Sequence, residues 1–445
     1  MRAPGLILAA PASSSGKTLV TLGLLRHLRR RGLRVAAAKA GPDYIDPTFL
    51  AAASGAPCVN LDPWAMRPAA LAGLVGRLEA ESELVVCEGV MGLFDGTGAT
   101  GETGSTAELA RLTGWPVVLV IDASGQGASA AALARGFALH DPDLPLAAII
   151  LNRVAGGRHR ALVEGALARH LLGIARLGAV AHDPGLTLPA RHLGLIPAGE
   201  RPGAAPVIER AAELVEAGLD IGRLIALAAP SRLEQSELLP GVPPIGNHIA
   251  VARDDAFVFI YAGQLAAWRA QGATVSFFSP LADEAPDPGA AAVFLPGGYP
   301  ELHAGRLAAA AAFRAGLRQA AAAGKPVYGE CGGYMALGDA LTDADGRAHR
   351  MAGLLPMVTS FAEPRLHLGY RQAVLLSPGP LGPRGGCFRG HEFHYATTAR
   401  QGPAEPLLSV TDATGRELGI AGMRCGPVFG SFVHLIDASG KPLRA

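Results

Sequence analysis

The chain has 445 residues, more than one hydrophobic core usually accommodates, so we expect at least two domains. Its 49% hydrophobic and 17% charged residues suffice for packed cores and exclude a disordered chain. A formal net charge of +1 excludes the strong field that gathers nucleic acid or an anionic membrane surface, so we expect small-molecule partners.

Cysteine usage and the short apolar runs indicate a cytoplasmic protein. The five cysteines are scattered, odd in number and without metal-ligand spacing, so neither a disulfide framework nor a zinc site is expected. The apolar run Leu6 to Ala10 is too short for the core of a signal peptide, and we interpret it as a buried strand. No later run is long and apolar enough to predict a transmembrane helix.

The first half of the chain alternates short apolar runs with alanine- and leucine-rich helical stretches. This alternation is typical of parallel strands joined by crossover helices, and it predicts an α/β fold with a doubly wound, mostly parallel sheet. The expected strands are "GLILAA", "RVAAAKA", "ELVVCEG", "PVVLVID" and "LAAIILNRV". A proline-rich break follows, so we place the boundary near Pro240 to Gly246, which gives domains at 1–240 and 247–445.

The second half repeats this pattern and predicts another α/β domain. Its first expected strands are "HIAVA", "TVSFFS", "AVFLPGG" and "PVYGEC". Two later stretches, "RLHLGYRQAVLL" and "GPVFGSFVHL", indicate extended and more antiparallel segments.

The stretch "APASSSGKT" lies between the first expected strand and a helix, which is the arrangement of a phosphate-binding loop. In such a loop the backbone amides point at phosphate oxygens, the lysine reaches further phosphates and the threonine hydroxyl can ligate magnesium. The usual leading glycine is missing, since Ala10 or Pro11 stands there, and a serine-rich turn before an ordinary helix is the alternative. The residues predicted to bind ATP in this loop are Ser15, Gly16, Lys17 and Thr18.

Acidic residues follow the next two expected strands. Ligands of open α/β sheets gather beyond the carboxyl ends of the strands, so these acids should converge on the phosphates, where oxygen ligands suit magnesium. They are Asp43, Asp46, Glu88 and Asp95. Lys39, at the end of its strand, is a further candidate for ATP binding. Asn152 and Arg153, which close the strand "AAIILN", could present an amide to the adenine edge, although an asparagine at a strand end can also be a simple turn residue.

The second domain holds a cysteine in the setting of a nucleophile. Cys331 in "GECGG" follows an expected strand and precedes an expected helix, and small residues on both sides permit the tight turn of a nucleophile elbow. A helix N-terminus would favour the thiolate, and a histidine base would complete its activation. The alternative is a small buried apolar residue, which is the interpretation we give the other four cysteines.

The partners of Cys331 are expected at two other strand ends. Gly297 and Gly298 in "FLPGGYPE" offer consecutive backbone amides for an oxyanion. The base candidate is His434 in "FGSFVHL", because residues far apart in sequence can be close in space. The competing histidines are His367, His391 and His394.

Together these motifs resemble the cobyrinic acid a,c-diamide synthase family, including its counterpart that acts on hydrogenobyrinic acid. The resemblance covers nearly the whole chain and implies an N-terminal ATPase domain like dethiobiotin synthetase and a C-terminal class I-type glutamine amidotransferase domain. It implies that ATP and glutamine serve to amidate the a and c carboxylates of a corrin through acyl phosphates. The stretches that carry it are "AAPASSSGKTLVTLGLLRHLRRRGLRV", "KAGPDYIDPTFLAAASG", "LDPW", "CEGVMGLFDG", "LPGGYPELHA", "YGECGGYMAL", "RGHEFHY" and "GSFVHL".

The resemblance also implies residue roles. Cys331 would be the glutaminase nucleophile, with His434 as its base. The four acids would serve the metal, the phosphoryl transfer and the carboxylate substrate, and magnesium would lie at Thr18, Asp46 and Glu88. Many class I glutaminases have a glutamate two residues after the histidine, whereas this chain has Ile436, and Glu392 is our guess for the missing group. Cationic candidates for the carboxylates of the corrin are Arg371, Arg389 and His391.

Related activities remain as alternatives at this point. Cobyric acid synthase and nickel-sirohydrochlorin a,c-diamide synthase are similar families, and "GPDYIDP" with "GHEFHY" favours the cobyrinic branch. A nucleotide-dependent binding protein of the ParA kind would share the phosphate loop but would not need the second domain. The sequence leaves open whether the corrin carries cobalt, which carboxylate reacts first and whether the chain forms a homodimer.

Overall fold

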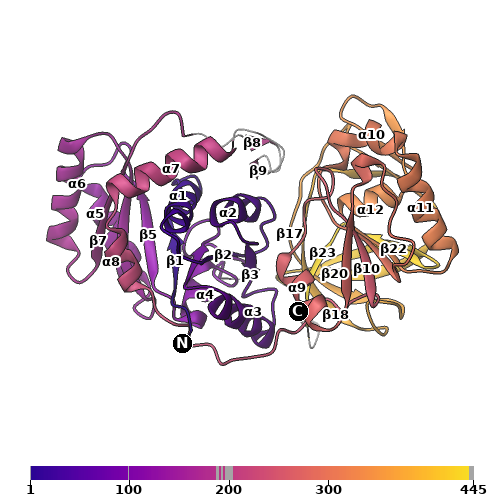
Figure 1. Cartoon of the computed structure of the whole chain (residues 1–445), viewed down its shortest axis with the longest axis horizontal. Helices are drawn as coiled ribbons and strands as arrows, with labels where there is room; N and C mark the ends of the chain where they lie inside the picture. Colours follow the sequence, from indigo (N-terminus) through magenta and orange to yellow (C-terminus); the bar gives the residue numbers. More distant parts are fainter. Residues whose placement is uncertain (1, 99, 187–189, 192–193, 196–203, 440–445) are drawn as a thin grey trace. The chain divides into compact units, whose positions relative to one another are not determined.

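The computed structural model describes residues 2–98, 100–186, 190–191, 194–195 and 204–439 (Figure 1). The chain divides into two compact units. Unit 1 comprises Met1–Trp64 and Leu71–Glu237, and unit 2 comprises Ala65–Ala70 and Leu238–Ala445. Among the described residues, no helix has both the length and the apolar character needed to cross a lipid bilayer.

Unit 1 is built on a sheet of seven parallel strands in the order β3-β2-β4-β1-β5-β6-β7. The central strands are buried along their whole length because helices cover both faces of a doubly wound sheet. The strands are β1 Gly5–Ala9, β2 Val35–Ala40, β3 Val59–Leu61, β4 Leu84–Glu88, β5 Val117–Asp122, β6 Leu146–Val154 and β7 Ala175–Ala181.

Helices connect the strands of unit 1, as the alternation in the sequence predicts. The first helix packs against α7, where Gly23 lies against the backbone of Ala211 and leaves no room for a side chain. A two-stranded ladder, β8 Ala190–Arg191 with β9 Gly194–Leu195, follows β7. The helices are α1 Lys17–Arg30, α2 Asp46–Ser54, α3 Pro68–Glu81, α4 Thr106–Thr113, α5 Ser129–His140, α6 Gly157–His170, α7 Ala204–Gly218 and α8 Ile221–Leu227.

All five strands expected in the first half are present, as β1, β2, β4, β5 and β6, and the predicted parallel α/β fold is confirmed. The sequence reading missed β3 and β7. The three residues of β3 are too few to give a periodic pattern, and Arg176 and Gly178 interrupt the apolar run of β7.

Unit 2 contains a ten-stranded sheet in the order β11-β10-β12-β13-β22-β21-β20-β17-β18-β23. The strands from β11 to β22 pair in parallel, and those from β22 to β23 pair antiparallel. The parallel strands are β10 His248–Ala252, β11 Thr274–Phe278, β12 Ala292–Leu295, β13 Val327–Glu330 and β22 Val428–Ser431. The others are β17 His367–Leu375, β18 Cys387–His394, β20 Glu405–Asp412, β21 Glu417–Cys425 and β23 His434–Ser439.

The sequence predicts antiparallel pairing late in the chain. β17 and β23 pair antiparallel with their neighbours, whereas β22 does so on one side alone. This strand pairs antiparallel with β21 and parallel with β13, so it joins the two halves of the sheet. Its parallel neighbour is the strand that ends directly before Cys331. A local sequence pattern does not reveal which strand will pair with a given segment, since the pairing depends on distant parts of the chain.

A smaller sheet and several helices complete unit 2 (Figure 1). The smaller sheet has the order β15-β14-β16-β19 and consists of β14 Ala340–Thr342, β15 Ala348–Arg350, β16 Met357–Ser360 and β19 Thr397–Gln401. The helices are α9 Ala262–Ala270, α10 Ala304–Ala309, α11 Ala311–Ala322 and α12 Gly332–Leu337, with short 3₁₀ turns η2 Pro280–Ala282 and η3 Pro300–His303.

The core of unit 2 lies on both faces of the large sheet. Along β12, Val293 and Leu295 belong to one buried cluster, whereas Ala292 and Phe294 belong to the other. This alternation follows from the strand period of two. It explains why the strand reads as a continuous apolar run rather than an alternating one.

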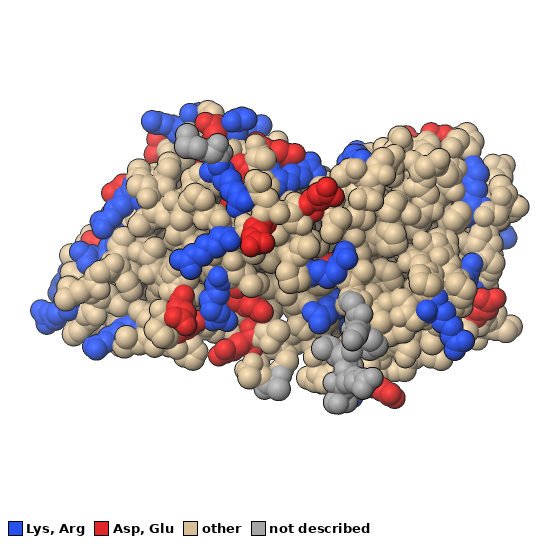
Figure 2. All heavy atoms as spheres, turned by 90° about the horizontal axis from the view of Figure 1, so that it is seen from below, with Lys and Arg blue, Asp and Glu red and all other residues tan. Residues whose placement is uncertain are grey.

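The charged side chains form no large patch of one sign on the face shown in Figure 2. There, lysine, arginine, aspartate and glutamate lie in small mixed groups among uncharged residues. This matches the formal net charge of +1.

Candidate active sites

The phosphate-binding loop of unit 1 lies between β1 and α1, as the sequence predicts. Gly16 caps the helix with a φ of 82°, a left-handed conformation that glycine adopts without strain. Any Cβ at Gly16 would overlap the amide of Asn152, which donates from Nδ2 to the Ser15 carbonyl oxygen at 2.9 Å. Asn152 therefore ties the loop to the end of β6. This contact uses one amide hydrogen, and a role of Asn152 toward adenine stays a prediction.

Lys17 begins α1 and is largely buried. Its Nζ lies 3.4 Å from the carbonyl oxygen of Met91, in the loop after β4. Burial first, and then the charge of Lys39, lower the pKa of Lys17, while Glu88, Asp46 and Asp43 oppose this change. An anionic phosphate in the loop would supply the compensating charge that this cation needs.

Four groups predicted from separate motifs meet at the carboxyl ends of β2 and β4. Lys39 Nζ donates to Asp46 Oδ2 at 2.6 Å and to Glu88 Oε1 at 3.0 Å. Thr18 Oγ1 donates to the same Glu88 oxygen at 2.7 Å. The structure thus brings Thr18, Lys39, Asp46 and Glu88 together, and we call these four residues the β2–β4 cluster.

Charge in the β2–β4 cluster is balanced at close range. Burial on its own lowers the pKa of Lys39, but Asp46, Glu88 and Asp43 outweigh it and raise that pKa well above the usual value. The pKa of Asp46 is lowered because the charge of Lys39 and its hydrogen bond overcome the effect of burial. Both residues are therefore ionised at neutral pH.

The pKa of Asp43 is shifted in the opposite direction to that of Asp46. Burial and the charge of Asp46 raise the pKa of Asp43 to about 6, although Lys39 and two backbone amides stabilise the charged form. Those amides, of Ile45 and Asp46, donate to Asp43 Oδ1 at 2.7 and 3.0 Å. Asp43 can therefore exchange a proton close to neutral pH.

The donor set of the β2–β4 cluster fits a magnesium ion. Glu88 is fully buried, and its Oε2 has no hydrogen-bond partner among the described residues. A buried carboxylate oxygen without a donor needs a cation, and a threonine hydroxyl beside it completes an oxygen-rich pair of ligands. The ion pair between Asp46 and Lys39 holds the Asp46 carboxylate in the same cluster as these two ligands.

Asp95 does not join this cluster in the described part of the chain. Its side chain is exposed and accepts from the amide of Gly92 at 2.9 Å, within its own turn. The expectation that all four acids converge is therefore met by the three acids after β2 and β4 but not by Asp95. The reason is local, because Asp95 is the seventh residue after the end of β4 and is held in its own turn by the Gly92 amide.

A pocket of about 410 Å³ lies on the other side of the phosphate loop. Asn152 and Arg153 line it at the end of β6, together with the segment after β7 and the first turn of α1. Arg153 adopts a φ of 56° and pairs with Asp122 at the end of β5. The sequence analysis named Asn152 and Arg153 but missed Asp122, whose only signal is its place at the end of a parallel strand.

In unit 2, Cys331 occupies the turn predicted for a nucleophile. It follows β13 directly and caps α12 with φ 45° and ψ −103°, a strained conformation for a residue with a side chain. Its amide donates to the Ser431 carbonyl oxygen at 2.8 Å, which fixes the turn against β22. A Cβ on Gly333 would overlap the backbone of Leu295, so the glycine that follows is required by the close packing of α12 on β12.

The environment of the Cys331 sulfur corrects one expectation. The thiol is buried, and burial together with the charges of Glu301 and Glu392 raises its pKa, against a smaller opposing effect of the Gly332 amide. The short helix α12 does not outweigh these contributions, so the resting group is a thiol and not the expected thiolate. A base must therefore take its proton when the sulfur attacks.

His434 lies where a base for this site is needed. It opens β23 and is fully buried. Its ring edge, Cε1 and Nε2, faces Gly297, since a Cβ there would overlap Cε1 and lie 3.0 Å from Nε2. Gly332, the residue directly after the nucleophile, lies against the Gly298 turn. A Cβ on Gly332 would be 2.9 Å from the amide nitrogen of Gly298. The predicted base thus lies against one of the predicted oxyanion glycines, and the other glycine lies against the residue that follows the nucleophile.

A carboxylate that the sequence analysis did not consider, that of Glu330, lies beside the second ring nitrogen of His434. Its Oε2 lies 3.6 Å from His434 Nδ1. The only sequence signal is its position directly before Cys331 in "GECGG".

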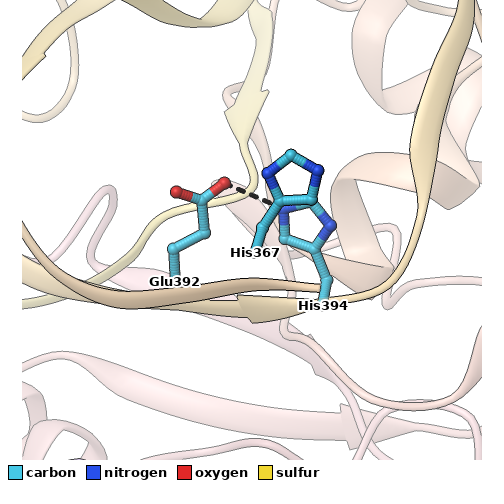
Figure 3. A group of neighbouring side chains, drawn as sticks. All are labelled: His367, Glu392 and His394. Atoms are coloured by element: carbon cyan, nitrogen blue, oxygen red, sulfur yellow. Dashed lines mark hydrogen bonds and ion pairs between the residues drawn. The ribbon is translucent and has the colours of Figure 1, made fainter. Parts of the chain in front are cut away.

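Glu392, our guess for that place, lies in a different network (Figure 3). Its Oε1 pairs with His394 Nε2 at 2.8 Å, and its Oε2 accepts from Arg371 Nε at 2.6 Å. Burial opposes the charged form, but the interactions with His394 and then with Arg371 outweigh it and lower the pKa of Glu392 to about 2. His367 stacks on the ring of His394 at 4.7 Å. The carboxylate is thus committed to Arg371 and His394, and the guess is wrong.

The three residues predicted to hold corrin carboxylates have different surroundings. Arg371 is mostly buried and neutralised by Glu392, and Arg389 lies opposite Asp437 in the β18–β23 pair. Burial, then His434 and Arg371, lower the pKa of His391 to about 3. His391 is therefore neutral at pH 7 and cannot act as the expected cation.

Comparison with known proteins matches both units. Residues 6–196 match the CobQ/CobB/MinD/ParA nucleotide binding domain, and residues 248–442 match the CobB/CobQ-like glutamine amidotransferase domain. Hydrogenobyrinate a,c-diamide synthase of Brucella anthropi is 53% identical over 439 residues, covering 98% of this chain and 99% of that protein. The chain belongs to the hydrogenobyrinate a,c-diamide synthase family.

Other relatives carry the same name. The hydrogenobyrinate a,c-diamide synthase of Rhizobium meliloti is 51% identical over 439 residues, and that of Mesorhizobium japonicum is 50% identical over 437 residues. Each match covers 98% of this chain and 99% of the relative. As a member of this family with a nucleotide-binding domain and a glutamine amidotransferase domain, the chain is a glutamine-dependent, amide-forming ligase.

Proposed function

We propose that this protein uses ATP and glutamine to convert the a and c carboxylates of hydrogenobyrinic acid into amides, within cobalamin biosynthesis. The full-length similarity to proteins named for that reaction supports the substrate. The observation that carries the chemistry is the presence, in one chain, of a phosphate loop beside the β2–β4 cluster and of a buried cysteine turn beside His434.

In unit 1 the chain would activate the carboxylate. A carboxylate resists attack by ammonia because its carbonyl is stabilised by resonance, so the γ-phosphate of ATP must first be transferred to it. The loop amides and Lys17 would orient the phosphates for in-line transfer. Asn152 would hold the loop in shape and, with Arg153, line the pocket for the base.

Thr18, Glu88 and Asp46 would hold magnesium, which supplies neutralisation of the charge that develops on the phosphates. Lys39 would keep Asp46 ionised and would hold both Asp46 and Glu88 in place. Asp43, with a pKa of about 6, would hydrogen-bond the carboxylate being activated. Asp95, on its exposed turn, would contact the substrate and not the metal.

In unit 2 the chain would release ammonia from glutamine. Cys331 Sγ attacks the side-chain amide carbon while His434 takes the thiol proton, and the oxyanion is stabilised by the amides around Gly297 and Gly298. The same proton passes to the leaving nitrogen, ammonia departs and a thioester remains. Water then hydrolyses the thioester to glutamate. A reducing compartment such as the cytoplasm would keep Cys331 as a thiol.

A comparison of nitrogen sources in a Cys331→Ala variant tests this division of labour. Wild-type protein with ATP, glutamine and hydrogenobyrinic acid should give a product in which two hydroxyl groups are replaced by amino groups, measured by mass spectrometry. The variant should form no product from glutamine and form the same product from ammonium salts. Failure of ammonium, with ATP turnover intact, would overturn the proposal, and parallel reactions with the cobalt-bearing acid would identify the preferred substrate.

A further inference from the structure

The position two residues after His434 is occupied by Ile436, a buried residue whose apolar side chain cannot accept a hydrogen bond. A histidine base works best when an acceptor on its second nitrogen fixes its orientation and tautomer. We propose that Glu330, the residue directly before the nucleophile, is that positioning residue. This inference rests on the proposed glutaminase reaction of unit 2.

Glu330 is held rigidly with one oxygen directed at the histidine. The residue is buried in β13, and its Oε1 accepts from the Tyr328 hydroxyl at 2.6 Å and from the Leu435 amide at 3.1 Å. Its Oε2 lies 3.6 Å from His434 Nδ1. Because both donors bind the same oxygen, the other oxygen is left for the imidazole. Hydrogen bonds of catalytic groups are often long before substrate binds and shorten in the complex.

The support for Glu330 extends into the core. The ring of Tyr328 stacks between Phe294 at 5.4 Å and Phe429 at 5.0 Å, so its hydroxyl cannot swing away. The Leu435 amide follows His434 directly, and one carboxylate therefore lies against both the backbone and the histidine ring at the start of β23. A shift of Glu330 would move the histidine with it.

The pleat of β13 explains how neighbours in sequence reach opposite sides of the site. Tyr328 and Glu330 are two residues apart and lie on the same face of the strand. Cys331 comes next and, with its strained φ of 45°, turns into the core cluster on the other face. The acid and the nucleophile can therefore approach His434 from two directions, with Nδ1 toward Glu330 and Nε2 toward the Gly297 turn.

In the proposed reaction Glu330 acts only as a hydrogen-bond acceptor. His434 Nδ1 donates to Glu330, which leaves the Nε2 lone pair available for the thiol proton of Cys331. When the sulfur–carbon bond forms, the imidazole becomes a cation next to a carboxylate that stabilises it. When the carbon–nitrogen bond breaks, Nε2 returns the proton to the leaving ammonia.

The decisive variant is Glu330→Gln, which keeps the size of the side chain and an oxygen for the Leu435 amide but removes the charge. We expect kcat for glutamine hydrolysis to fall by about 10²–10⁴-fold with little change in KM. Ammonium-dependent amidation should stay at the wild-type rate, since it does not use His434. Tyr328→Phe removes only a hydroxyl, and we expect a fall of about 3- to 10-fold in kcat because one anchor of the carboxylate is lost.

Asp437→Asn is the matched control, because Asp437 is also a buried carboxylate, lies in β23 and has Arg67 as its partner. It should lower the melting temperature and leave kcat for glutamine hydrolysis unchanged. Glutamine hydrolysis at the wild-type kcat in Glu330→Gln, with or without lower stability, would overturn the positioning role. If wild-type protein itself released no glutamate, the proposed function would fail, which is a different result.

Discussion

Lys39 and Glu88 are register partners on the neighbouring strands β2 and β4, and their side chains meet, with Nζ 3.0 Å from Oε1. Both are buried, so neither charge is screened by water. The same Glu88 oxygen accepts from Thr18 at the start of α1. The pairing of β2 with β4 therefore positions Glu88, our proposed metal ligand, relative to the proposed phosphate-binding loop.

Removal of the buried cation should be costly to the fold of unit 1. In Lys39→Met the charges of Glu88 and Asp46 lose their partner, and we expect the free energy of unfolding to fall by about 3–5 kcal/mol. Urea unfolding measures this. The double variant Lys39→Met, Glu88→Gln should recover part of the loss because one uncompensated charge is gone, whereas additive losses would contradict a coupled pair.

The hydroxyl of Thr18 should matter for ATP turnover and not for the fold. In Thr18→Val the donor to Glu88 and the predicted magnesium ligand are lost, and we expect ammonium-dependent turnover to fall by about 10²-fold or more. Thr18→Ser should keep most of the activity. Thr21→Val is the control, because Thr21 is one turn along α1 and bonds only to the Lys17 carbonyl among the described residues. Equal losses at both threonines would contradict the assignment.

The absence of a side chain at Gly297 should be essential for the glutaminase. In Gly297→Ala the new methyl group would overlap the His434 ring and displace it, so we expect kcat/KM for glutamine hydrolysis to fall by about 10²-fold. Gly305→Ala is the control, since a Cβ there comes no closer than 3.8 Å to His349. It should keep full glutamine hydrolysis and the same or slightly higher stability. If Gly297→Ala hydrolysed glutamine at the wild-type rate, the observed position of the His434 ring would not be required for catalysis.

His391 should make unit 2 less stable in mild acid. Its pKa is about 3 in the folded protein and near its ordinary value of 6.5 in the unfolded chain, so between these values only the unfolded chain takes up the proton. The stabilising contribution is therefore complete above pH 6.5 and decreases as the pH falls toward 3. From pH 7 to pH 5 the loss should be about 2 kcal/mol.

His391→Asn should remove this loss, which urea unfolding at pH 7, 6 and 5 will measure. The variant and the wild type should differ in slope against pH, whatever their difference at pH 7. Parallel stability curves would show that His391 takes up its proton in the folded protein as well.

Much of the site could be predicted from the sequence because each motif is a local pattern. The strand before "SSSGKT", the glycine of the loop, and the small residues around Cys331 are fixed by neighbours in the chain, where glycine permits the backbone that phosphate loops and nucleophile turns require. The same holds for the strands β1, β2, β4, β5 and β6, whose apolar runs need no partner to be recognised.

Only the tertiary structure decided which groups meet and which charges they carry. Glu330 and not Glu392 faces His434 because β13 lies beside β22 in the sheet, a pairing of segments about one hundred residues apart in the chain. Asp95 stays outside the β2–β4 cluster because of the turn that holds it. Cys331 is a thiol and His391 a neutral base because ionisation depends on burial and on the sum of nearby charges. Those quantities exist only once distant strands have packed together.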